Sequence, residues 1–193
     1  MVENIIKKNR SYRRFNEQRE IAPETLKELI SLARYAPSAA NRQPLKYIIS
    51  HEQEKNEKIF PCLSWAGYLE NWTGPEPGER PAAYVIILND NEINQEPEAA
   101  KTDVGIAAQS ILLGAVRKDL GGCIFGAIDR KKLRQNLDIQ DRYDIMNIIA
   151  LGEPDEKIVL ETSESKEDIK YWRDEQGVHH VPKRPLNELI LNS

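Results

Sequence analysis

The positions of apolar residues repeat with helical spacing in several parts of the chain. The clearest repeat covers 21–36, where Pro23 suits the first turn, an apolar stripe follows and Pro37 ends the helix. A longer helix is expected over 99–120, and its apolar face is wide and rich in small residues, which predicts burial on more than one side. Shorter helices are expected over 2–8, 52–60 and 130–136 and from Leu186 onward.

Runs of consecutive apolar residues alternate with these helices and predict strands at 46–50, 83–88 and 145–151. A further strand is expected at 121–126, where glycines stand on both sides of an apolar segment. From Asp155 onward the chain is mostly polar and has little pattern that would build a core. We therefore expect one domain over 1–193, whose C-terminal tail (about 155–193) packs on a partner subunit.

The composition restricts the kinds of partner. The 193 residues are 40% hydrophobic and 30% charged, and the formal net charge is -4, which argues against nucleic acid or an anionic membrane as the main partner. There is no apolar run of the roughly 20 residues that a membrane span requires, and the N-terminus has no secretory apolar core. The two cysteines, Cys62 and Cys123, lack the spacing of a metal site, so a reduced, cytoplasmic location is expected.

The familiar catalytic motifs are missing from the sequence. There is no Gly-x-Ser-x-Gly turn, no phosphate loop ending in Gly-Lys and no Gly-x-Gly-x-x-Gly after a strand. The histidines His51, His179 and His180 lack the helical spacing of zinc ligands, and no metal site is predicted. No side-chain acid, base or nucleophile is therefore assigned a catalytic role.

A loop between two prolines, Pro37 to Pro44, follows the clearest helix. It combines small residues with a hydroxyl, two amides and a guanidinium. Ser38, Asn41 and Gln43 offer donors and acceptors to the edge of a heterocycle. Considered alone, the loop is explained at least as well as a polar connection between a helix and a strand.

Basic residues gather at two places far apart in the sequence. Near the N-terminus, Arg10, Ser11 and Arg13 form a set suited to a phosphate, although a solvated basic face would have the same composition. Near the C-terminus stand Lys183 and Arg184. With the polar loop and the glycine-flanked strand, these residues suit a ligand with a phosphate at one end and a planar polar ring at the other, which is the outline of flavin mononucleotide (FMN). Such a cofactor carries redox chemistry itself, which accounts for the missing catalytic side chains.

An irregular segment, Pro61 to Pro81, contains two tryptophans and a tyrosine beside a Pro/Gly-rich loop. Two interpretations stay open for this aromatic segment. It is either a lid over a binding site or a partner-facing surface, or a long loop that its aromatic side chains anchor to the core.

In these residues the chain resembles the nitroreductase family of FMN-dependent oxidoreductases over nearly its whole length. Asn9 to Arg13 resembles the family's Arg-Arg-Ser-x-Arg phosphate motif, with Asn9 in place of the first arginine. Pro37 to Pro44 is similar to the family's Pro-Ser-x-x-Asn-x-Gln-Pro loop. Further likenesses are Asp103 to Ser110 with the start of the long interface helix, Gly121 to Gly126 with the strand beneath the flavin ring, and Lys183-Arg184 with the basic pair near the C-terminus.

The resemblance implies a three-layer α+β fold with a mixed central sheet flanked by helices, in an intertwined homodimer that holds FMN at each of two interfaces. It implies that the phosphate and ribityl chain are held by Arg10, Ser11, Arg13, Lys183 and Arg184. It implies that the flavin is reached from the other subunit by Pro37, Ser38, Asn41 and Gln43, and that main-chain amides around Phe125 and Gly126 lie near flavin N5.

The activity implied by the resemblance is the transfer of a hydride from NADH or NADPH through flavin N5 to a nitroaromatic, a quinone or a related small electrophilic acceptor. The same fold hosts other flavin chemistry, such as reductive dehalogenation or flavin fragmentation, and a non-catalytic dimeric FMN-binding module is a third interpretation. The residues do not distinguish NADH from NADPH, name the natural acceptor or separate one-electron from two-electron reduction.

Overall fold

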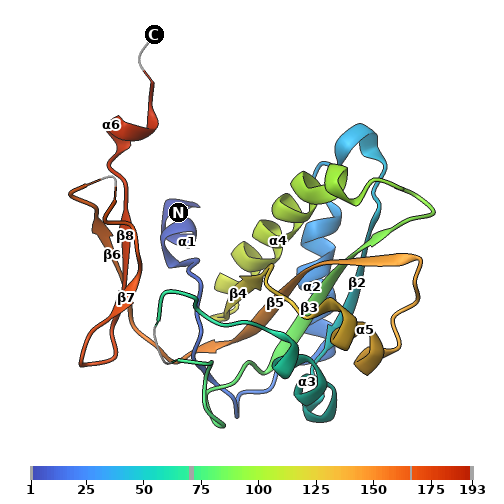
Figure 1. Cartoon of the computed structure of the whole chain (residues 1–193), viewed down its shortest axis with the longest axis horizontal. Helices are drawn as coiled ribbons and strands as arrows, with labels where there is room; N and C mark the ends of the chain where they lie inside the picture. Colours follow the sequence, from blue (N-terminus) through green and yellow to red (C-terminus); the bar gives the residue numbers. More distant parts are fainter. Residues whose placement is uncertain (1, 70–71, 166, 192–193) are drawn as a thin grey trace.

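A computed structural model gives the structure of the protein and describes residues 2–69, 72–165 and 167–191. Residues 70–71 of the aromatic segment, and 166 and 192–193 of the tail, lie outside these ranges. The helices are α1 (Val2–Lys8), α2 (Pro23–Arg34), α3 (Gln53–Ile59), α4 (Lys101–Val116), α5 (Arg130–Leu137) and α6 (Leu186–Leu189). The strands are β1 (Phe15–Asn16), β2 (Leu45–Ser50), β3 (Ala83–Asp90), β4 (Gly121–Phe125), β5 (Tyr143–Pro154), β6 (Ile158–Thr162), β7 (Trp172–Arg173) and β8 (His179–Lys183). The helices and strands expected from the sequence are confirmed, with ends that differ by a few residues (Figure 1).

The central sheet has five strands in the described chain, in the order β1-β5-β3-β2, and β4 also pairs with β5. These strand pairs are antiparallel. Ser50 at the end of β2 lies opposite Tyr84 near the start of β3. The chain therefore enters β3 at the same end of the sheet at which it left β2, and the two strands run in opposite directions. The resemblance implies a mixed sheet, whereas these strand pairs are all antiparallel, and the expectation is corrected on this point. Within the described ranges, the parallel pairing in this sheet is a single bridge between Ser11 and Gly122.

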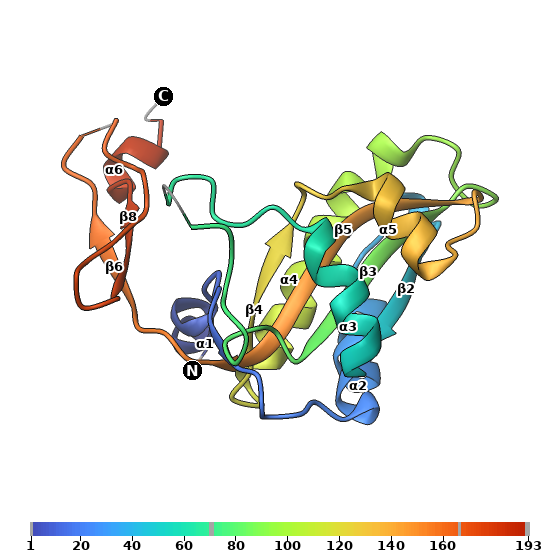
Figure 2. The same ribbon diagram turned by 60° about the horizontal axis from the view of Figure 1, so that its bottom comes forward.

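Helices cover both faces of this sheet, with α2 and α4 on one face and α3 and α5 on the other (Figures 1 and 2). The side chains of β3 alternate between the two layers. Val85 and Ile87 belong to the core beneath α2 and α4, whereas Tyr84 and Ile86 belong to the core beneath α3 and α5. Every residue of β3 is buried, as expected for a strand that is covered on both sides. The predicted three-layer α+β sandwich is confirmed.

The helix α4 packs beside α2 on one face of the sheet. Its buried positions include Val104, Ala107, Ala108 and Ile111, so that burial extends around more than one stripe, as the small-residue pattern predicts. A Cβ atom at Gly114 would lie 2.4 Å from Leu32 Cδ1 of α2. The glycine therefore permits the close approach of the two helices.

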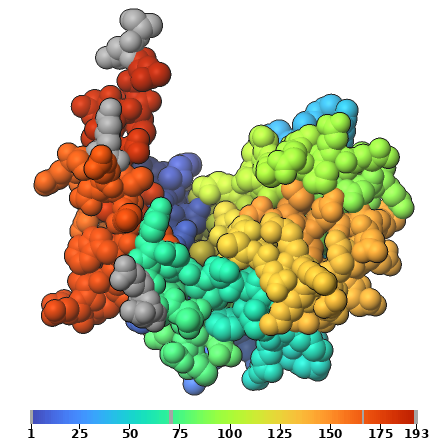
Figure 3. Space-filling view, viewed as in Figure 1, coloured from blue at the N-terminus to red at the C-terminus, as the bar shows by residue number. Residues whose placement is uncertain are grey.

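The tail forms a smaller sheet of its own, in the order β6-β8-β7. Strands β6 and β8 are parallel, and β7 and β8 are antiparallel. At its centre, His180 places Nδ1 2.5 Å from Glu161 Oε1 and Nε2 3.2 Å from Asp174 Oδ2, and its ring stacks on Trp172 with centroids 4.0 Å apart. The hydrogen bonds to the two carboxylates raise the pKa of His180. This sheet lies at one side of the molecule, next to the N-terminal segment and the aromatic segment (Figure 3).

Within the ranges that the structure describes, no helix combines the length and the apolar character needed to cross a bilayer.

Candidate functional site

A basic cavity of about 360 Å³ lies where the N-terminal segment, α4, β4 and the tail meet. It is lined by Asn9, Arg10, Ser11, Arg13, Gln109, Leu112, Ile124, Tyr171, His179, Val181 and Lys183. Four of the residues predicted to hold a phosphate, Arg10, Ser11, Arg13 and Lys183, therefore line one cavity. Most of the chain separates Lys183 from the other three in the sequence. Arg184 is exposed and does not line the basic cavity.

The guanidinium of Arg13 is the buried cation of this cavity, and the residue is 9% exposed. Its Nη1 donates to the Ser11 carbonyl oxygen at 3.2 Å and lies 3.0 Å from His179 Nε2. The Tyr171 ring centroid lies 4.5 Å from its Cζ atom. None of the ion pairs among the described residues includes Arg13. A buried cation without a counter-ion is costly, so this arrangement favours an anionic ligand.

A nearby carboxylate, Glu156, is used for another purpose. Its side chain is 1% exposed and pairs with the Arg173 guanidinium at 3.1 Å. It also accepts from the backbone N–H groups of Arg13 and Arg14. Glu156 therefore fixes the path of the N-terminal segment and balances Arg173, while the positive charge of the Arg13 side chain is left for a ligand.

His179 is fully buried against Arg13, and its protonation state follows from that contact. Burial, together with the charges of Arg13 and Arg173, lowers the pKa of His179 to about 4, so the imidazole is neutral near pH 7. A guanidinium can only donate, so Nε2 is the acceptor and Nδ1 carries the proton. This Nδ1 and the Nε of Arg10 are both buried without a hydrogen-bond partner in the described part of the chain. Two N–H donors of residues that line the basic cavity are thus left unpaired within the described ranges.

A second cavity, of about 670 Å³, adjoins the basic one, because Ile124 lines both. Ile124 points outward from β4 and is 41% exposed. Gly105, Gly126 and Asn147 also line this second cavity. A Cβ atom at Gly105 would meet no atom within 4 Å, so backbone is accessible here to a flat ligand. The side chain of Phe125, in contrast, is buried against Trp65, and Phe125 does not line this second cavity.

The loop Pro37 to Pro44 lines a third cavity, of about 300 Å³, through Pro37, Ser38 and Gln43. Asp103 in the first turn of α4 fixes this loop. Its Oδ2 accepts from Ser38 Oγ at 2.6 Å, and its Oδ1 accepts from the Ala39 N–H at 3.1 Å. The Ser38 hydroxyl oxygen in turn accepts from the Gln43 N–H at 2.9 Å. In this structure the Ser38 hydroxyl shapes the loop.

The backbone of the same loop is strained. Ala40, Asn41 and Gln43 have positive φ angles of 50°, 54° and 52°. Residues other than glycine rarely adopt this conformation, and it persists where surrounding contacts hold it. The Gln43 side-chain amide donates to Asn41 Oδ1 at 3.1 Å, and both side chains are exposed. The strained loop therefore presents two exposed amides on a base that is fixed by Asp103.

The predicted site residues thus fall into separate regions of one chain. Asp103 at the loop and Leu112 at the basic cavity are nine residues apart on α4, or about 13 Å at 1.5 Å per residue. Sequence reasoning placed Asp103 and Gln109 in the long helix without giving either a role at the site, and it missed Tyr171 and the contact of His179 with Arg13. Asp103 had a usable signal, because it is an acid within the apolar pattern of the long helix, whereas Tyr171 and His179 reach the cavity only through the fold of the tail.

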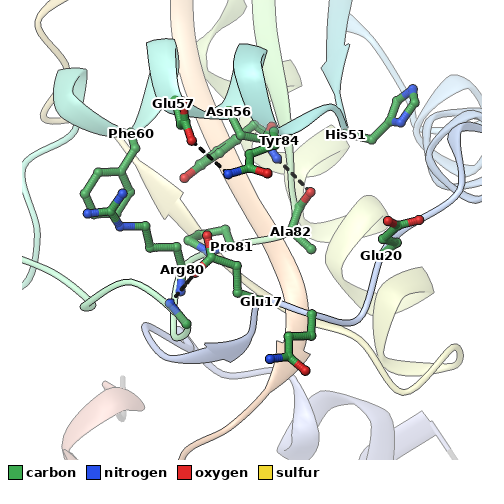
Figure 4. Close-up of a pocket in the computed structure, with 13 residues that line it drawn as sticks. Glu17, Glu20, His51, Asn56, Glu57, Phe60, Arg80, Pro81, Ala82 and Tyr84 are labelled. Carbon is green, nitrogen blue, oxygen red and sulfur yellow. Dashed lines mark hydrogen bonds between the residues drawn. The ribbon is translucent and has the colours of Figure 1, made fainter.

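Figure 4 shows another cavity, of about 350 Å³, between α3 and the segments at 17–20 and 78–82. Its polar wall is largely paired within the protein. Glu17 accepts from backbone N–H groups of Gly78 and Arg80, and Asn56 donates to the Ala82 carbonyl oxygen at 2.8 Å. The Arg80 guanidinium lies over the Phe60 ring at 4.3 Å. These contacts join α3 to the loop before β3, and the carboxylates around this cavity make it unsuited to an anion.

The fold defines an α+β sandwich whose basic cavity lies beside an open, partly apolar one. A model of the nitroreductase family matches residues 6–153, and the chain belongs to this family.

Individual relatives and solved structures agree with this assignment. A provisionally named NADH dehydrogenase/NAD(P)H nitroreductase of Archaeoglobus fulgidus is 26% identical over 166 residues, which cover 83% of this chain and 90% of the relative. The iodotyrosine deiodinase of Thermotoga neapolitana is 22% identical over 172 residues, covering 81% and 90%. A crystal structure of a provisionally named nitroreductase from Desulfovibrio desulfuricans in complex with FMN has a TM-score of 0.71 at 20% identity, covering 100% of this chain and 96% of that one.

Proposed function

We propose that the protein is an FMN-dependent oxidoreductase that uses NADH or NADPH to reduce a small electrophilic acceptor, such as a nitroaromatic or a quinone. The observation that carries the proposal is the buried Arg13 guanidinium, which pairs with no carboxylate in the described chain and lines a cavity with other basic groups. Family membership supports it, as do the FMN complex of the Desulfovibrio structure and the name of the archaeal relative.

The residues present suit FMN. Arg10, Ser11, Arg13 and Lys183 would hold its phosphate, since together they supply cationic and hydroxyl donors around an uncompensated buried charge. The adjoining cavity, lined by Gly105, Gly126 and Asn147, would take the ring system. The two glycines have no side chain that would cover the backbone there. FMN, when bound, supplies the hydride chemistry. The chain's own contribution is to neutralise the phosphate, orient the ring and exclude water with Ile124 and the α4 side chains.

The proposed assembly is a homodimer in which the Pro37 to Pro44 loop of one subunit completes the site of the other, with Pro37, Ser38, Asn41 and Gln43 as the contributing residues. The loop lies at the N-terminal end of α4, away from the basic cavity of its own chain. The tail offers a surface for a partner, because Leu186, Leu189 and Ile190 are all more than half exposed. The tail would then cover the partner subunit.

The visible spectrum of the purified protein tests the proposed function directly. We expect flavin absorption in the protein as isolated or after addition of FMN, and bleaching under anaerobic conditions by NADH or NADPH. A protein that stays colourless with FMN present would refute the proposal. A flavin that binds but is reduced by neither nicotinamide would instead identify a non-catalytic FMN-binding module.

Subunit mixing tests the shared site. Two variants, Arg13→Ala and Gln43→Ala, are each expected to bind FMN weakly, because each damages both sites of its homodimer. A heterodimer of the two carries one site with both substitutions and one site with neither. We expect the mixture to regain tight FMN binding at up to half of the sites of the heterodimer. If mixing restores nothing, Arg13 and the loop act within one subunit.

A second candidate function is reductive dehalogenation, and the similarity to the Thermotoga iodotyrosine deiodinase favours it. Reoxidation of the reduced protein distinguishes the two functions. A nitroaromatic and a quinone are compared with a halogenated aromatic compound under anaerobic conditions, and released halide is measured. Fast reoxidation by the halogenated compound with stoichiometric halide would favour the second candidate.

A further inference from the structure

The aromatic segment and the tail meet directly above Arg13. The Tyr171 ring contacts the Arg13 guanidinium, with 4.5 Å from the centroid to Cζ. On its other sides the same ring packs against Tyr68, with centroids 5.0 Å apart, and against His179, with centroids 5.2 Å apart. The Tyr171 hydroxyl accepts from the Tyr68 N–H at 3.4 Å. Tyr171 is thus held between the aromatic segment, β8 and the buried cation.

The base of the aromatic segment is anchored in the core. Trp65 is 7% exposed and packs edge-on against Phe125, with centroids 4.6 Å apart, and against Trp72, at 6.2 Å. Trp72 in turn lies beneath the Arg173 guanidinium at 4.9 Å. Of the two interpretations open from the sequence, core anchoring is confirmed for the tryptophans. Tyr68 extends from this base to Tyr171, which lines the basic cavity.

The contacts of Arg13 fix its orientation. The Ser11 carbonyl and His179 Nε2 occupy donors on Nη1, and Tyr171 covers one face of the planar group. A guanidinium has five N–H donors, so donors remain that no group in the described part of the chain engages, and these can bind a ligand in the basic cavity. An aromatic ring attracts a cation through its face without taking up any of its hydrogen-bond donors. Tyr171 can therefore restrain Arg13 without competing with the ligand.

We propose that Tyr171 is a positioning residue, which holds the Arg13 guanidinium toward the basic cavity so that it binds the phosphate end of the cofactor, and that Tyr68 supports Tyr171 in this role. The inference rests on the proposed function for the identity of the anion. On this proposal the aromatic segment increases the affinity for the ligand, through the contact of Tyr68 with Tyr171, and does not only pack on the core.

Three substitutions separate positioning from general stability of the tail. Tyr171→Leu removes the ring, Tyr171→Phe keeps it, and Trp172→Leu is the matched control, because the neighbouring Trp172 stacks on His180 and makes no contact with Arg13 that the structure shows. FMN affinity is measured by quenching of flavin fluorescence. We expect Tyr171→Leu to bind FMN about five- to thirtyfold more weakly, the range set by loss of one cation–π contact. Tyr171→Phe and Trp172→Leu stay within about twofold of the original chain.

A double-mutant cycle identifies the residue through which Tyr171 acts. In an Arg13→Ala background, Tyr171→Leu is expected to change FMN affinity by less than about twofold, because the cation that it restrains is gone. The proposal is overturned if the two losses multiply, if Tyr171→Phe binds as weakly as Tyr171→Leu, or if Trp172→Leu gives the same loss. Circular dichroism establishes that each variant is folded. If Tyr171→Leu does not fold, Tyr68→Leu replaces it, since Tyr68 is 55% exposed, and a reduced affinity is again expected.

A second ligand distinguishes failure of this inference from failure of the proposed function. Inorganic pyrophosphate is titrated calorimetrically into the same five variants, including Arg13→Ala and its double variant with Tyr171→Leu, and into the original chain. If FMN does not bind but pyrophosphate does, the proposed cofactor is wrong and the cycle with pyrophosphate still tests Tyr171. If the original chain binds neither, Arg13 serves no anion and the positioning role is refuted as well.

Discussion

Asp103 gives the sharpest test of how the strained loop is held. The substitution Asp103→Asn keeps the size of the side chain and removes its charge. At present the two carboxylate oxygens accept from Ser38 Oγ at 2.6 Å and from the Ala39 N–H at 3.1 Å. An asparagine has one acceptor oxygen, so its NH₂ group must face one of these two donors.

The magnitude follows from these two bonds. A hydrogen bond to a charged group contributes about 1.5–3 kcal/mol and a neutral one about 0.5–1.5 kcal/mol. Asp103→Asn loses one charged bond and weakens the other in a site that is 5% exposed, and it removes a carboxylate from the favourable N-terminal turn of α4. We expect the free energy of unfolding to fall by about 2–3 kcal/mol, which corresponds to a melting temperature about 4–12 °C lower for a chain of this size.

Thermal unfolding followed by circular dichroism measures the effect, with Asp141→Asn as the control because the Asp141 side chain is fully exposed. The control is expected to melt within about 1 °C of the original chain. Ser38→Ala should also destabilise the protein, and the double variant should lose less than the sum, since both residues share one bond. If Asp103→Asn melts together with the control, Asp103 does not hold the loop.

The other predictions concern the ligand, the tail and the core. Arg13→Ala should weaken FMN binding by about ten- to 150-fold, through loss of charge-assisted hydrogen bonds, and an unchanged affinity in a fluorescence titration would place the phosphate elsewhere. His180 has a raised pKa, so its stabilising contacts are complete below the unfolded value of about 6.5 and are lost as the pH rises through the folded pKa. His180→Gln should therefore lower the melting temperature more at pH 5.5 than at pH 8.5, and an equal loss at both pH values would contradict this. Gly122→Ala should lower the free energy of unfolding by about 1–3 kcal/mol, because the added Cβ would lie 2.5 Å from the Ala150 carbonyl oxygen. Gly105→Ala should instead raise the free energy of unfolding by about 0.5–1 kcal/mol, since the added Cβ meets open space within α4. Chemical denaturation measures both, and equal effects of the two glycine substitutions would show that local space does not decide them.

The central layers were predictable because their strands and helices bury side chains at regular spacing. The run at 83–88 became β3, which is buried at every position, and the stripe at Leu26, Leu29 and Ala33 became the core face of α2. The pairing directions were not predictable in the same way. Apolar runs fix which residues are buried, but the connections between strands decide whether neighbours are parallel or antiparallel.

The tail sheet escaped prediction because its strands have little apolar pattern. His179 and His180 are neighbours in β8 and point to different environments, one into the basic cavity and one between two carboxylates. Residue type alone does not separate these two histidines. The basic residues Arg10, Arg13 and Lys183, which line the basic cavity, could be selected from charge in the sequence. Tyr171 became relevant only once the tail had folded back over Arg13.

The contact between Arg13 and His179 joins residues that are 166 positions apart, and it forms one wall of the basic cavity. During synthesis the first of these residues leaves the ribosome long before the second exists. The nascent chain can form the helices and strands of the central layers before His179 is available to contact Arg13. Under the proposed function, binding of the anionic ligand is therefore a late event in maturation, which begins only when β8 has left the ribosome.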